Sequence, residues 1–205
     1  MASPSEFGQP DQPERSAANA ARSGSAADLR LLERIKKGDL DAFQCLYQDF
    51  QPRLTRFLMN LVHHPQLVEE VLDDTLLVVW DKAAAFKGES KLSTWIFAIA
   101  YRKAMKALRK HDLPLEDTQA QSRLSEEPGP EEDWAQKRLH SLLRGAMAKL
   151  SPQHRAVVDL TYFHDLGYRE VAEILKCPVD TVKTRMFYAR RYLRESLEGE
   201  MDDWL

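Results

Sequence analysis

The sequence predicts an all-α protein made of two small helical domains joined by an acidic linker. Apolar residues recur at the 3.6-residue spacing of helices on both sides of residues 112–133. That segment itself contains Pro, Gly and many acidic residues and has no helical period, which is typical of a flexible, self-repelling linker. We therefore expect one domain over residues 28–111 and a second over residues 134–198.

The two ends of the chain are predicted to lie outside the domains. Residues 1–27 are rich in Ser, Ala, Pro, Gly and Gln and have almost no large apolar side chains. Such a segment cannot bury enough surface to offset its ordering entropy, so we expect a disordered tail. Residues 199–205 form an acidic tail that is expected to fray, although a regulatory role is the alternative.

Composition narrows the classes of function. The net charge is −3, so any nucleic-acid contact must come from local basic patches. Cys45 and Cys177 have no metal-ligand spacing, which favours a reducing cytoplasmic setting and gives no support for a disulfide or a zinc site. The apolar runs are too short to span a bilayer and the N-terminus lacks a secretory pattern, so no stable membrane insertion is expected.

Four helices are predicted in the first domain, over residues 28–38, 41–62, 65–85 and 92–110. Gly38 ends the first helix, and Asp39 or Asp41 starts the second. Pro52 lies inside the apolar pattern of the second helix and is expected to kink it. Pro65 suits the first position of the third helix, where a missing N–H is of no consequence.

The third helix combines a core stripe with an acidic face that carries an apolar residue. The residues of this face are Glu70, Asp73, Asp74, Leu77 and Asp81, and Trp80 lies close to it. Taken alone, such a face is most simply solvated surface. The alternative is a docking surface, where acidic side chains steer a basic partner and apolar ones hold it.

The fourth helix starts apolar and becomes strongly basic. Its cations are Arg102, Lys103, Lys106, Arg109 and Lys110. Lys87 and Lys91 add positive charge in the loop before it. Cations suit the last turn of a helix, but this number exceeds what capping needs, and a phosphate-binding end is the competing interpretation.

The second domain ends in a helical hairpin over residues 168–197. Ser151 and Pro152 start the helix before it, as N-cap and first residue, and Pro178 suits the first position of the hairpin's second helix. That second helix has a buried stripe at Val182, Met186, Ala189 and Leu193. Its other sides present Lys183, Thr184, Arg185, Phe187, Tyr188, Arg190, Arg191 and Arg194. This pattern is typical of a DNA recognition helix, and the alternative is a generic helical hairpin with a solvated basic face.

The chain resembles the extracytoplasmic-function (ECF) sigma factors of bacterial RNA polymerase, in the sigma-70 family. The first domain resembles sigma region 2 in AFQCLYQDF (42–50), VEEVLDDTLLVVWDKAAAF (68–86) and STWIFAIAYRKAMKALRK (93–110). The second resembles region 4 over residues 150–194. The order and spacing of these motifs around an acidic linker make the resemblance specific. It implies a four-helix region 2 domain and a helix-turn-helix region 4 domain.

The resemblance also implies roles for individual residues. The acidic face of the third helix matches the surface that docks on the clamp helices of the polymerase β′ subunit. The −10 element of the promoter would meet Lys87, Lys91, Trp95, Arg102 and Lys106. The −35 element would meet Lys183, Thr184, Phe187 and Tyr188, with Arg185, Arg190 and Arg191 on phosphates. The sequence departs from the usual family pattern at Arg102, at Lys106 and at Asp180, where Gly is usual.

The prediction for function is an alternative sigma factor without catalytic chemistry and without a cofactor. Its expected partners are core RNA polymerase (the β′ clamp helices and the β flap), promoter DNA and an anti-sigma factor. One alternative is a stand-alone helix-turn-helix regulator, but no element resembles the dimerisation unit that it needs. The other is a small helical enzyme, against which the histidines show no metal-ligand spacing and no phosphate loop or nucleophile motif occurs.

Overall fold

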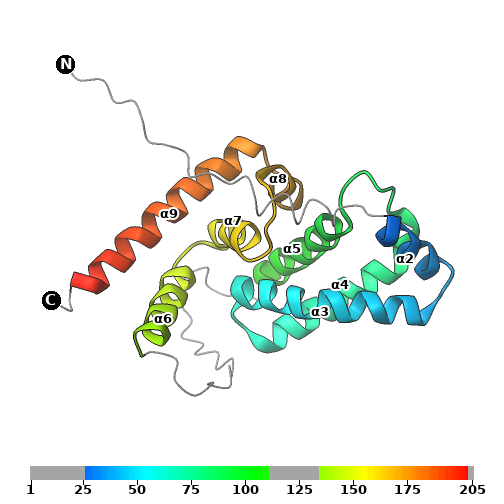
Figure 1. Ribbon diagram of the computed structural model, residues 1–205, viewed down its shortest axis with the longest axis horizontal. Helices are drawn as coiled ribbons and strands as arrows, with labels where there is room; N and C mark the ends of the chain where they lie inside the picture. The colour runs from blue at the N-terminus through cyan, green and yellow to red at the C-terminus, as the bar shows by residue number, and fades with distance from the viewer. Residues whose placement is uncertain (1–25, 111–133, 203–205) are drawn as a thin grey trace.

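The computed structural model describes residues 26–110 and 134–202, and this part of the chain is helical without strands (Figure 1). Its helices are α2 (Ala26–Lys36), α3 (Leu40–Val62), α4 (Pro65–Asp81), the 3₁₀ turn η1 (Ala83–Ala85), α5 (Leu92–Lys110), α6 (Trp134–Ala148), α7 (Pro152–Tyr162), α8 (Tyr168–Leu175) and α9 (Val179–Asp202). The all-α class is therefore confirmed. The predictions for residues 1–25, the linker 112–133 and residues 203–205 lie outside the described residues.

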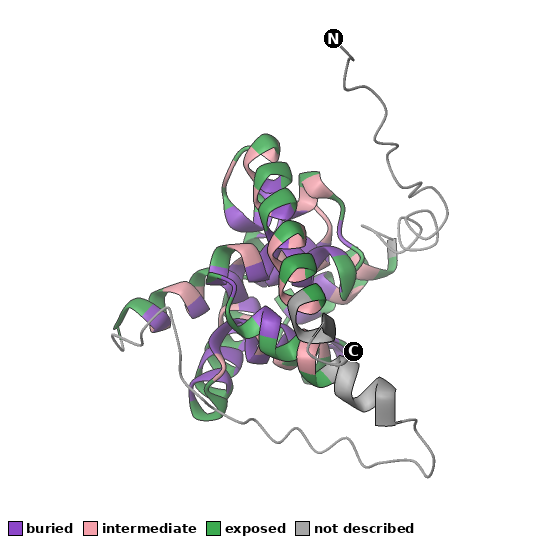
Figure 2. Cartoon of the chain, turned by 90° about the vertical axis from the view of Figure 1, so that its left-hand side faces the viewer, coloured by how far each residue is buried: buried purple, intermediate pink, exposed green. Residues whose placement is uncertain are grey.

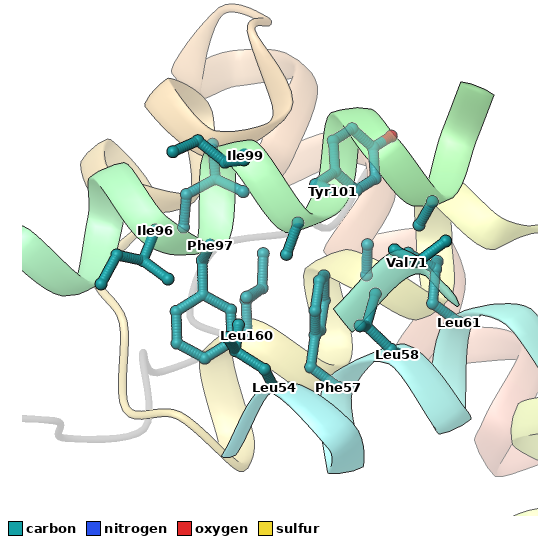
Figure 3. Packing of buried hydrophobic residues seen from close by; sticks show 14 of the residues in the cluster. Leu54, Phe57, Leu58, Leu61, Val71, Ile96, Phe97, Ile99, Tyr101 and Leu160 are labelled. Carbon is teal, nitrogen blue, oxygen red and sulfur yellow. The ribbon is translucent and has the colours of Figure 1, made fainter. Parts of the chain in front are cut away.

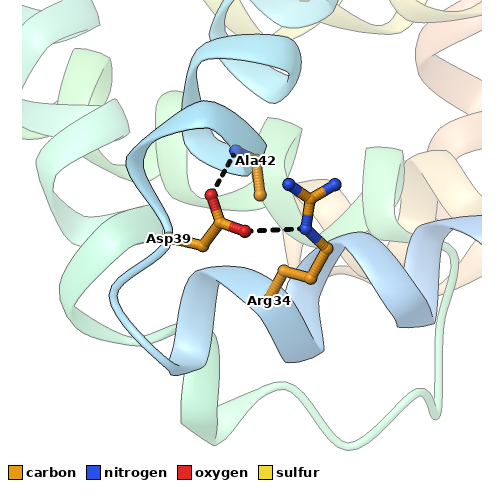
Figure 4. Close-up of polar contacts among 3 residues, drawn as sticks. All are labelled: Arg34, Asp39 and Ala42. Atoms are coloured by element: carbon orange, nitrogen blue, oxygen red, sulfur yellow. Dashed lines mark hydrogen bonds and ion pairs between the residues drawn. The ribbon is translucent and has the colours of Figure 1, made fainter.

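The junction between α2 and α3 is held by Asp39. Its carboxylate accepts a hydrogen bond from the Ala42 amide at 3.0 Å, which caps the start of α3, and a second from Arg34 Nε at 2.7 Å (Figure 4). These two contacts, the Ala42 amide first, lower the pKa of Asp39. Gly38 precedes it with a φ of +80°, a conformation that glycine adopts without a Cβ clash.

The turn between α3 and α4 uses two histidines. His63 ends α3 with a left-handed φ of 56°, and His64 caps α4 by accepting from the Leu67 amide. Pro65 starts α4 as predicted, and α3 runs unbroken through Pro52. The third helix is shorter than predicted, because α4 ends at Asp81 and the chain continues as the turn η1.

Aromatic and aliphatic side chains of α3 and α5 form the centre of the core (Figure 3). Phe57 and Phe97 are fully buried, and their rings meet edge to face with centroids 5.3 Å apart. Leu160 of α7 lies in the same cluster, although α7 comes after the predicted linker. The buried residues of both halves thus form one continuous core.

The two halves pack against each other along two helix pairs. α7 lies against α3, and α8 lies against α5, while α9 lies on the far side of α7 and α8 in Figure 1. Figure 2 shows buried residues on the facing sides of the helices and exposed ones on their outer sides. The composition of residues 112–133 predicts where one half ends and the other begins along the sequence. It does not predict that the two halves contact each other in space.

Within the described residues, no helix combines the length and the apolarity needed to cross a membrane.

Candidate nucleic-acid interface

The helix-turn-helix consists of α8, a turn at residues 176–178 and α9. Lys176 ends α8 in the left-handed region with a φ of 50°, and its amide and that of Cys177 bond back to α8 carbonyls. α9 begins at Val179, one residue later than the predicted start at Pro178. Its inward stripe is buried as predicted at Val182, Met186 and Ala189. Packing of this stripe on α7 and α8 fixes which side of α9 faces outward.

The outward side of α9 presents the predicted −35 residues together. Phe187 is 63% exposed and Tyr188 is 54% exposed, which is unusual for large aromatic rings. The two rings meet edge to face at 5.5 Å. Lys183 and Thr184 are exposed one turn earlier, and both donate hydrogen bonds to Asp180. Lys183 Nζ donates to the Asp180 carboxylate at 3.0 Å, and the Thr184 hydroxyl donates to the Asp180 carbonyl at 2.9 Å.

The three arginines predicted to meet phosphates all have partners within the chain. Arg185 is half-buried and donates to Gln153 Oε1 at 2.6 Å, so its side chain lies back toward α7. The Arg190 guanidinium lies over the Tyr162 ring, 5.5 Å from its centroid. Arg191 pairs with Glu195 at 2.8 Å on the exposed surface. The sequence pattern of α9 could not predict these partners, because most of them lie on other helices.

The acidic side chains predicted to bind polymerase share the outer face of α4. Glu70, Asp73 and Asp74 are exposed, and Leu77 is 58% exposed among them. Asp74 pairs with Lys103 of α5 at 2.8 Å. Trp80 differs from the others, because it is half-buried with its ring edge-on to Phe43 at 5.1 Å. Most of its surface therefore supports the fold.

The residues predicted for the −10 element lie along α5 and the loop before it. Trp95, Arg102 and Lys106 follow one another at spacings of seven and four residues, which aligns them on one side of the helix. Arg102 and Lys106 are exposed, as is Lys87 in the loop. Trp95 is half-buried against the Phe86 ring at 5.3 Å.

Lys91 is the predicted −10 residue that the second half of the chain contacts directly. Its ammonium pairs with Glu170 Oε1 of α8 at 2.9 Å. The Thr94 hydroxyl donates to the same oxygen at 3.4 Å. Glu170 Oε2 accepts the Gly167 amide at 2.9 Å, so one carboxylate caps α8 and joins it to α5. The sequence analysis did not predict this contact, whose partners are seventy-nine residues apart.

A buried polar cluster joins α3 to α7. Asn60 donates to Asp159 Oδ2, and His164 Nε2 lies 3.1 Å from Asp159 Oδ1. The His164 ring is buried beside Phe97, with centroids 4.6 Å apart. Arg155 adds donors to the last carbonyls of α3, at Asn60 and Leu61. The hydrogen bonds that join α3 to α7 have no local sequence signal, since Asn60 is ninety-nine residues from Asp159 and ninety-five from Arg155.

No group of three His, Cys, Asp or Glu residues in the described ranges is arranged to hold a metal ion. Cys45 is exposed on α3 and Cys177 is half-buried in the turn before α9. The exposed charged faces described above are an acidic one on α4, a basic one on α5 and a basic one with aromatic side chains on α9.

Comparison with known proteins assigns both halves of the chain. The sigma-70 region 2 family model matches residues 46–113, and the sigma-70 region 4 model matches residues 140–193. The ECF RNA polymerase sigma factor RpoE of Cereibacter sphaeroides is 31% identical over 160 residues, which cover 78% of this chain and 88% of that protein. The chain belongs to the ECF sigma factors of the sigma-70 family.

Other relatives of this sigma factor span most of its length. The RNA polymerase sigma-H factor of Pseudomonas aeruginosa is 25% identical over 181 residues, which cover 83% of this chain and 94% of that protein. Family membership makes the protein an alternative sigma factor, which directs transcription initiation. A stand-alone helix-turn-helix regulator is not favoured, because region 2 accounts for the first half of the chain.

Two solved structures share the fold of this sigma factor. CnrH, solved in complex with the cytosolic domain of CnrY, is 21% identical and has a TM-score of 0.63, covering 84% of this chain and 98% of that one. The sigma factor RpoE of Bartonella quintana, solved with the anti-sigma factor NepR, is 24% identical with a TM-score of 0.61 and covers 76% of this chain and 96% of that one. The arrangement of helices is thus shared with proteins of low sequence identity.

Proposed function

We infer that this sigma factor uses three surfaces in initiation, on α4, α5 and α9. The α4 surface (Glu70, Asp73, Asp74, Leu77) binds the clamp helices of the polymerase β′ subunit. The α5 surface (Lys87, Lys91, Trp95, Arg102, Lys106) holds the −10 element as it melts. The α9 surface (Lys183, Thr184, Phe187, Tyr188) reads the −35 element. Residues 28–111 and 134–198 act as the two functional domains, and neither carries catalytic chemistry.

The observation that carries the polymerase proposal is the exposure of Leu77 in the middle of the α4 carboxylates. An exposed leucine surrounded by acids has the composition of a protein interface, with an apolar anchor and a charged rim. A basic helical partner satisfies both features, since its cations pair with the rim and its apolar residues cover Leu77. Trp80 supports this surface from below through its contact with Phe43.

The exposed rings of α9 support the DNA proposal. Phe187 and Tyr188 would meet thymine methyl groups or base edges in the major groove, which is wide enough for a helix. Lys183 supplies a donor at the N-terminal end of α9, where recognition helices contact bases. Arg191 lies further along the exposed side, and Arg194 a turn beyond it, both suited to phosphates.

The proposed binding of the −10 element by Lys91 requires the two halves of the protein to separate. Lys91 is paired with Glu170 of α8, so this cation becomes available to a phosphate only when α8 leaves α5. Arg102 and Lys106 are exposed in either case, and Trp95 offers a ring on which a displaced base could stack. Opening of the two halves is therefore part of the proposed mechanism.

Protein partners follow from the same proposal. Residues 134–198 would contact the β flap of the polymerase, and an anti-sigma factor would hold the protein inactive until a signal arrives. The support for the latter is that the structurally similar sigma factor RpoE of Bartonella quintana was solved in complex with the anti-sigma factor NepR. We expect this protein to bind its inhibitor through surfaces that it also needs for initiation.

The test of the proposed function is initiation in vitro by purified core polymerase with this protein on genomic fragments. Asp73→Arg with Asp74→Arg should abolish co-purification with β′ and initiation, because two carboxylates of the docking rim become cations. Glu33→Arg with Asp49→Arg makes the same change of charge at exposed sites on α2 and α3 and should leave both activities intact. Retained β′ binding by the first variant would contradict the α4 assignment.

A further inference from the structure

We propose that Asp180 is a specificity-determining residue, which accepts a hydrogen bond from the exocyclic amino group of a cytosine in the −35 element while Lys183 binds a guanine beside it. The inference rests on the proposed function of α9 and adds a base-reading carboxylate to it. It follows from three features of the structure: the position of Asp180, its contact with Lys183 and its exposure.

Asp180 lies in the first turn of α9 on the side that faces away from the protein. Residues 180, 183, 184 and 187 follow the spacing of one helix face, so Asp180 continues the surface of Lys183, Thr184 and Phe187 toward the N-terminus. Val182 is fully buried, which fixes the rotation of this turn. The N-terminal residues of a recognition helix are those that reach base edges.

The backbone beneath Asp180 is fixed by its neighbour. The Thr184 hydroxyl donates to the Asp180 carbonyl at 2.9 Å. This bond holds the Thr184 hydroxyl within the helix, so Thr184 presents its methyl group to the DNA. The polar chemistry at this end of α9 therefore belongs to Asp180 and Lys183.

The ion pair between Asp180 and Lys183 can break so that each side chain binds the edge of a base instead. The Asp180 side chain is 90% exposed and that of Lys183 is 60% exposed, and their charged atoms lie 3.0 Å apart. An ion pair so open to water contributes little stability, so breaking or sharing it costs little. The separation is close to the rise of about 3.4 Å between stacked bases. Donor and acceptor therefore fit adjacent base pairs.

The chemistry of the bases decides which pair is preferred. Lysine donates to guanine O6 and N7, and a carboxylate accepts from the cytosine N4 amino group. Adenine also has an amino group, but its N7 acceptor beside it repels a carboxylate, as do guanine O6 and thymine O4. Asp180 therefore both favours cytosine and disfavours the other bases at one position.

The negative charge of Asp180 makes a purely phosphate-directed role unfavourable. The start of a helix attracts phosphate through its free amides and dipole. A carboxylate in that turn offsets the attraction, so it weakens binding wherever no amino group compensates for it. The expected result is lower affinity for unrelated sequences and a sharper preference at the cytosine.

The test is initiation by the holoenzyme on a library of promoters randomised through the −35 element. The wild-type protein should show a cytosine preference at one position, and Asp180→Ala should reduce this preference roughly tenfold while other positions keep theirs. Asp180→Asn retains an acceptor and gains a donor, so it should tolerate guanine or thymine at that position. Glu195→Ala removes the other exposed carboxylate that pairs with a cation on α9 and should leave the profile unchanged.

Two results would overturn the inference without touching the proposed function. One is that the wild-type holoenzyme initiates normally and that the Asp180→Ala holoenzyme has the same base preferences as the wild type. The other is an Asp180→Ala variant that becomes more active on every sequence alike, which would show general repulsion of phosphate. Absence of initiation by the wild-type protein on every fragment would instead overturn the proposed function, and this inference with it.

Discussion

His63 shows at the scale of one residue how the fold makes stability depend on pH. It ends α3 with a left-handed φ of 56°, and its half-buried ring has no hydrogen-bond partner for Nε2 among the described residues. Desolvation, with the nearby Arg155 cation as the second cause, lowers the pKa of His63 to about 4 from its ordinary value of 6.5. The folded protein therefore disfavours the proton that the unfolded chain binds.

The sign of the resulting pH dependence follows from that difference. Between pH 6.5 and about 4 the unfolded state gains a proton on His63 that the folded state lacks, so stability falls as the pH falls through this window. With partial exposure of the ring taken into account, the loss between pH 7.5 and 5 is about 1 kcal/mol. Asn adopts the left-handed backbone conformation and does not titrate. The free energy of unfolding of the His63→Asn variant should therefore fall by about 1 kcal/mol less than that of the wild type over this pH range.

Urea unfolding of both proteins at pH 7.5 and pH 5 measures this difference. The comparison between the two proteins cancels the titration of all other groups. Equal loss of unfolding free energy in the two proteins would show that His63 takes up its proton while folded.

Single residues also show which parts of the molecule are readable from sequence. Ser151 was predicted to start a helix, as was either Asp39 or Asp41. Ser151 and Asp39 each accept a backbone amide three residues on, because a cap depends only on local residues. The environment of His63 was not predicted from the sequence. The Arg155 cation that helps to lower its pKa comes ninety-two residues later, and no local pattern contains that information.

At the scale of elements, Arg155 of α7 connects the ends of two other helices. Its side chain is buried, and its guanidinium donates to the α6 carbonyls of Met147 and Ala148, to Leu150 just beyond, and to Asn60 and Leu61 at the end of α3. The last carbonyls of a helix lack partners within it and carry partial negative charge. Burial lowers the pKa of Arg155 to about 10, which leaves it charged at neutral pH.

Arg155→Lys should therefore lower the unfolding free energy by about 2–3 kcal/mol, because an ammonium with three donors cannot reach both helix ends and leaves buried carbonyls without partners. The same substitution at exposed Arg169 of α8 should cost less than about 0.5 kcal/mol. Chemical denaturation of the three proteins checks this. A loss at Arg155 no larger than at Arg169 would mean that water satisfies these carbonyls.

The helices themselves were predicted well where the pattern and the end signals agreed. α5 has the predicted bounds, and three of the four residues predicted for the stripe of α9 are buried, while Leu193 is half-buried. The error at the end of α4 has a local cause, since the three alanines at 83–85 favour helix and carry no stop signal, yet the chain turns there to bury Ala83 and Phe86. α9 also continues to Asp202, beyond the predicted hairpin end at Leu197.

At the scale of the whole molecule, the packing of the two halves conflicts with the proposed use of α5 and α9 on one promoter. The −10 and −35 elements are centred about 25 base pairs apart, which is roughly 85 Å of straight duplex. α8 rests on α5 here, so the two proposed reading surfaces cannot reach both elements at once. Residues 112–133, fully extended, could span about 75 Å, which together with the domains is enough for both elements.

Sequence reasoning predicted the two domains and their separation along the chain, and it missed their contact. The contact depends on Glu170 with Lys91, which directly precedes α5, and on Asp159 with Asn60. The helices that position these residues were predicted separately. Helical periodicity states which face of a helix is buried, but it does not name the partner that buries it. The same limit applied to the partners of Arg185 and Arg190.

The contact between the halves predicts that a single charge can open the molecule. Asn60→Asp would place a carboxylate against Asp159, where the Asn60 amide now donates in a partly buried setting. Two carboxylates at hydrogen-bond distance repel strongly at low local dielectric, and separation of α3 from α7 relieves the repulsion without unfolding either half. Gln51→Glu is the control, because it also changes an amide to an acid on α3, but Gln51 contacts only Thr55 of its own helix in the hydrogen bonds described. This variant should not separate α3 from α7.

Small-angle X-ray scattering of the free protein measures the outcome. At neutral pH, Asn60→Asp should show a larger radius of gyration than wild type and Gln51→Glu, while circular dichroism reports equal helix content. The expansion should diminish as the pH is lowered, because protonation of one carboxylate restores a hydrogen bond between the halves. A compact Asn60→Asp protein at neutral pH would mean that the apolar contacts around Leu160 and Phe97 hold the halves together on their own, and that opening requires the polymerase.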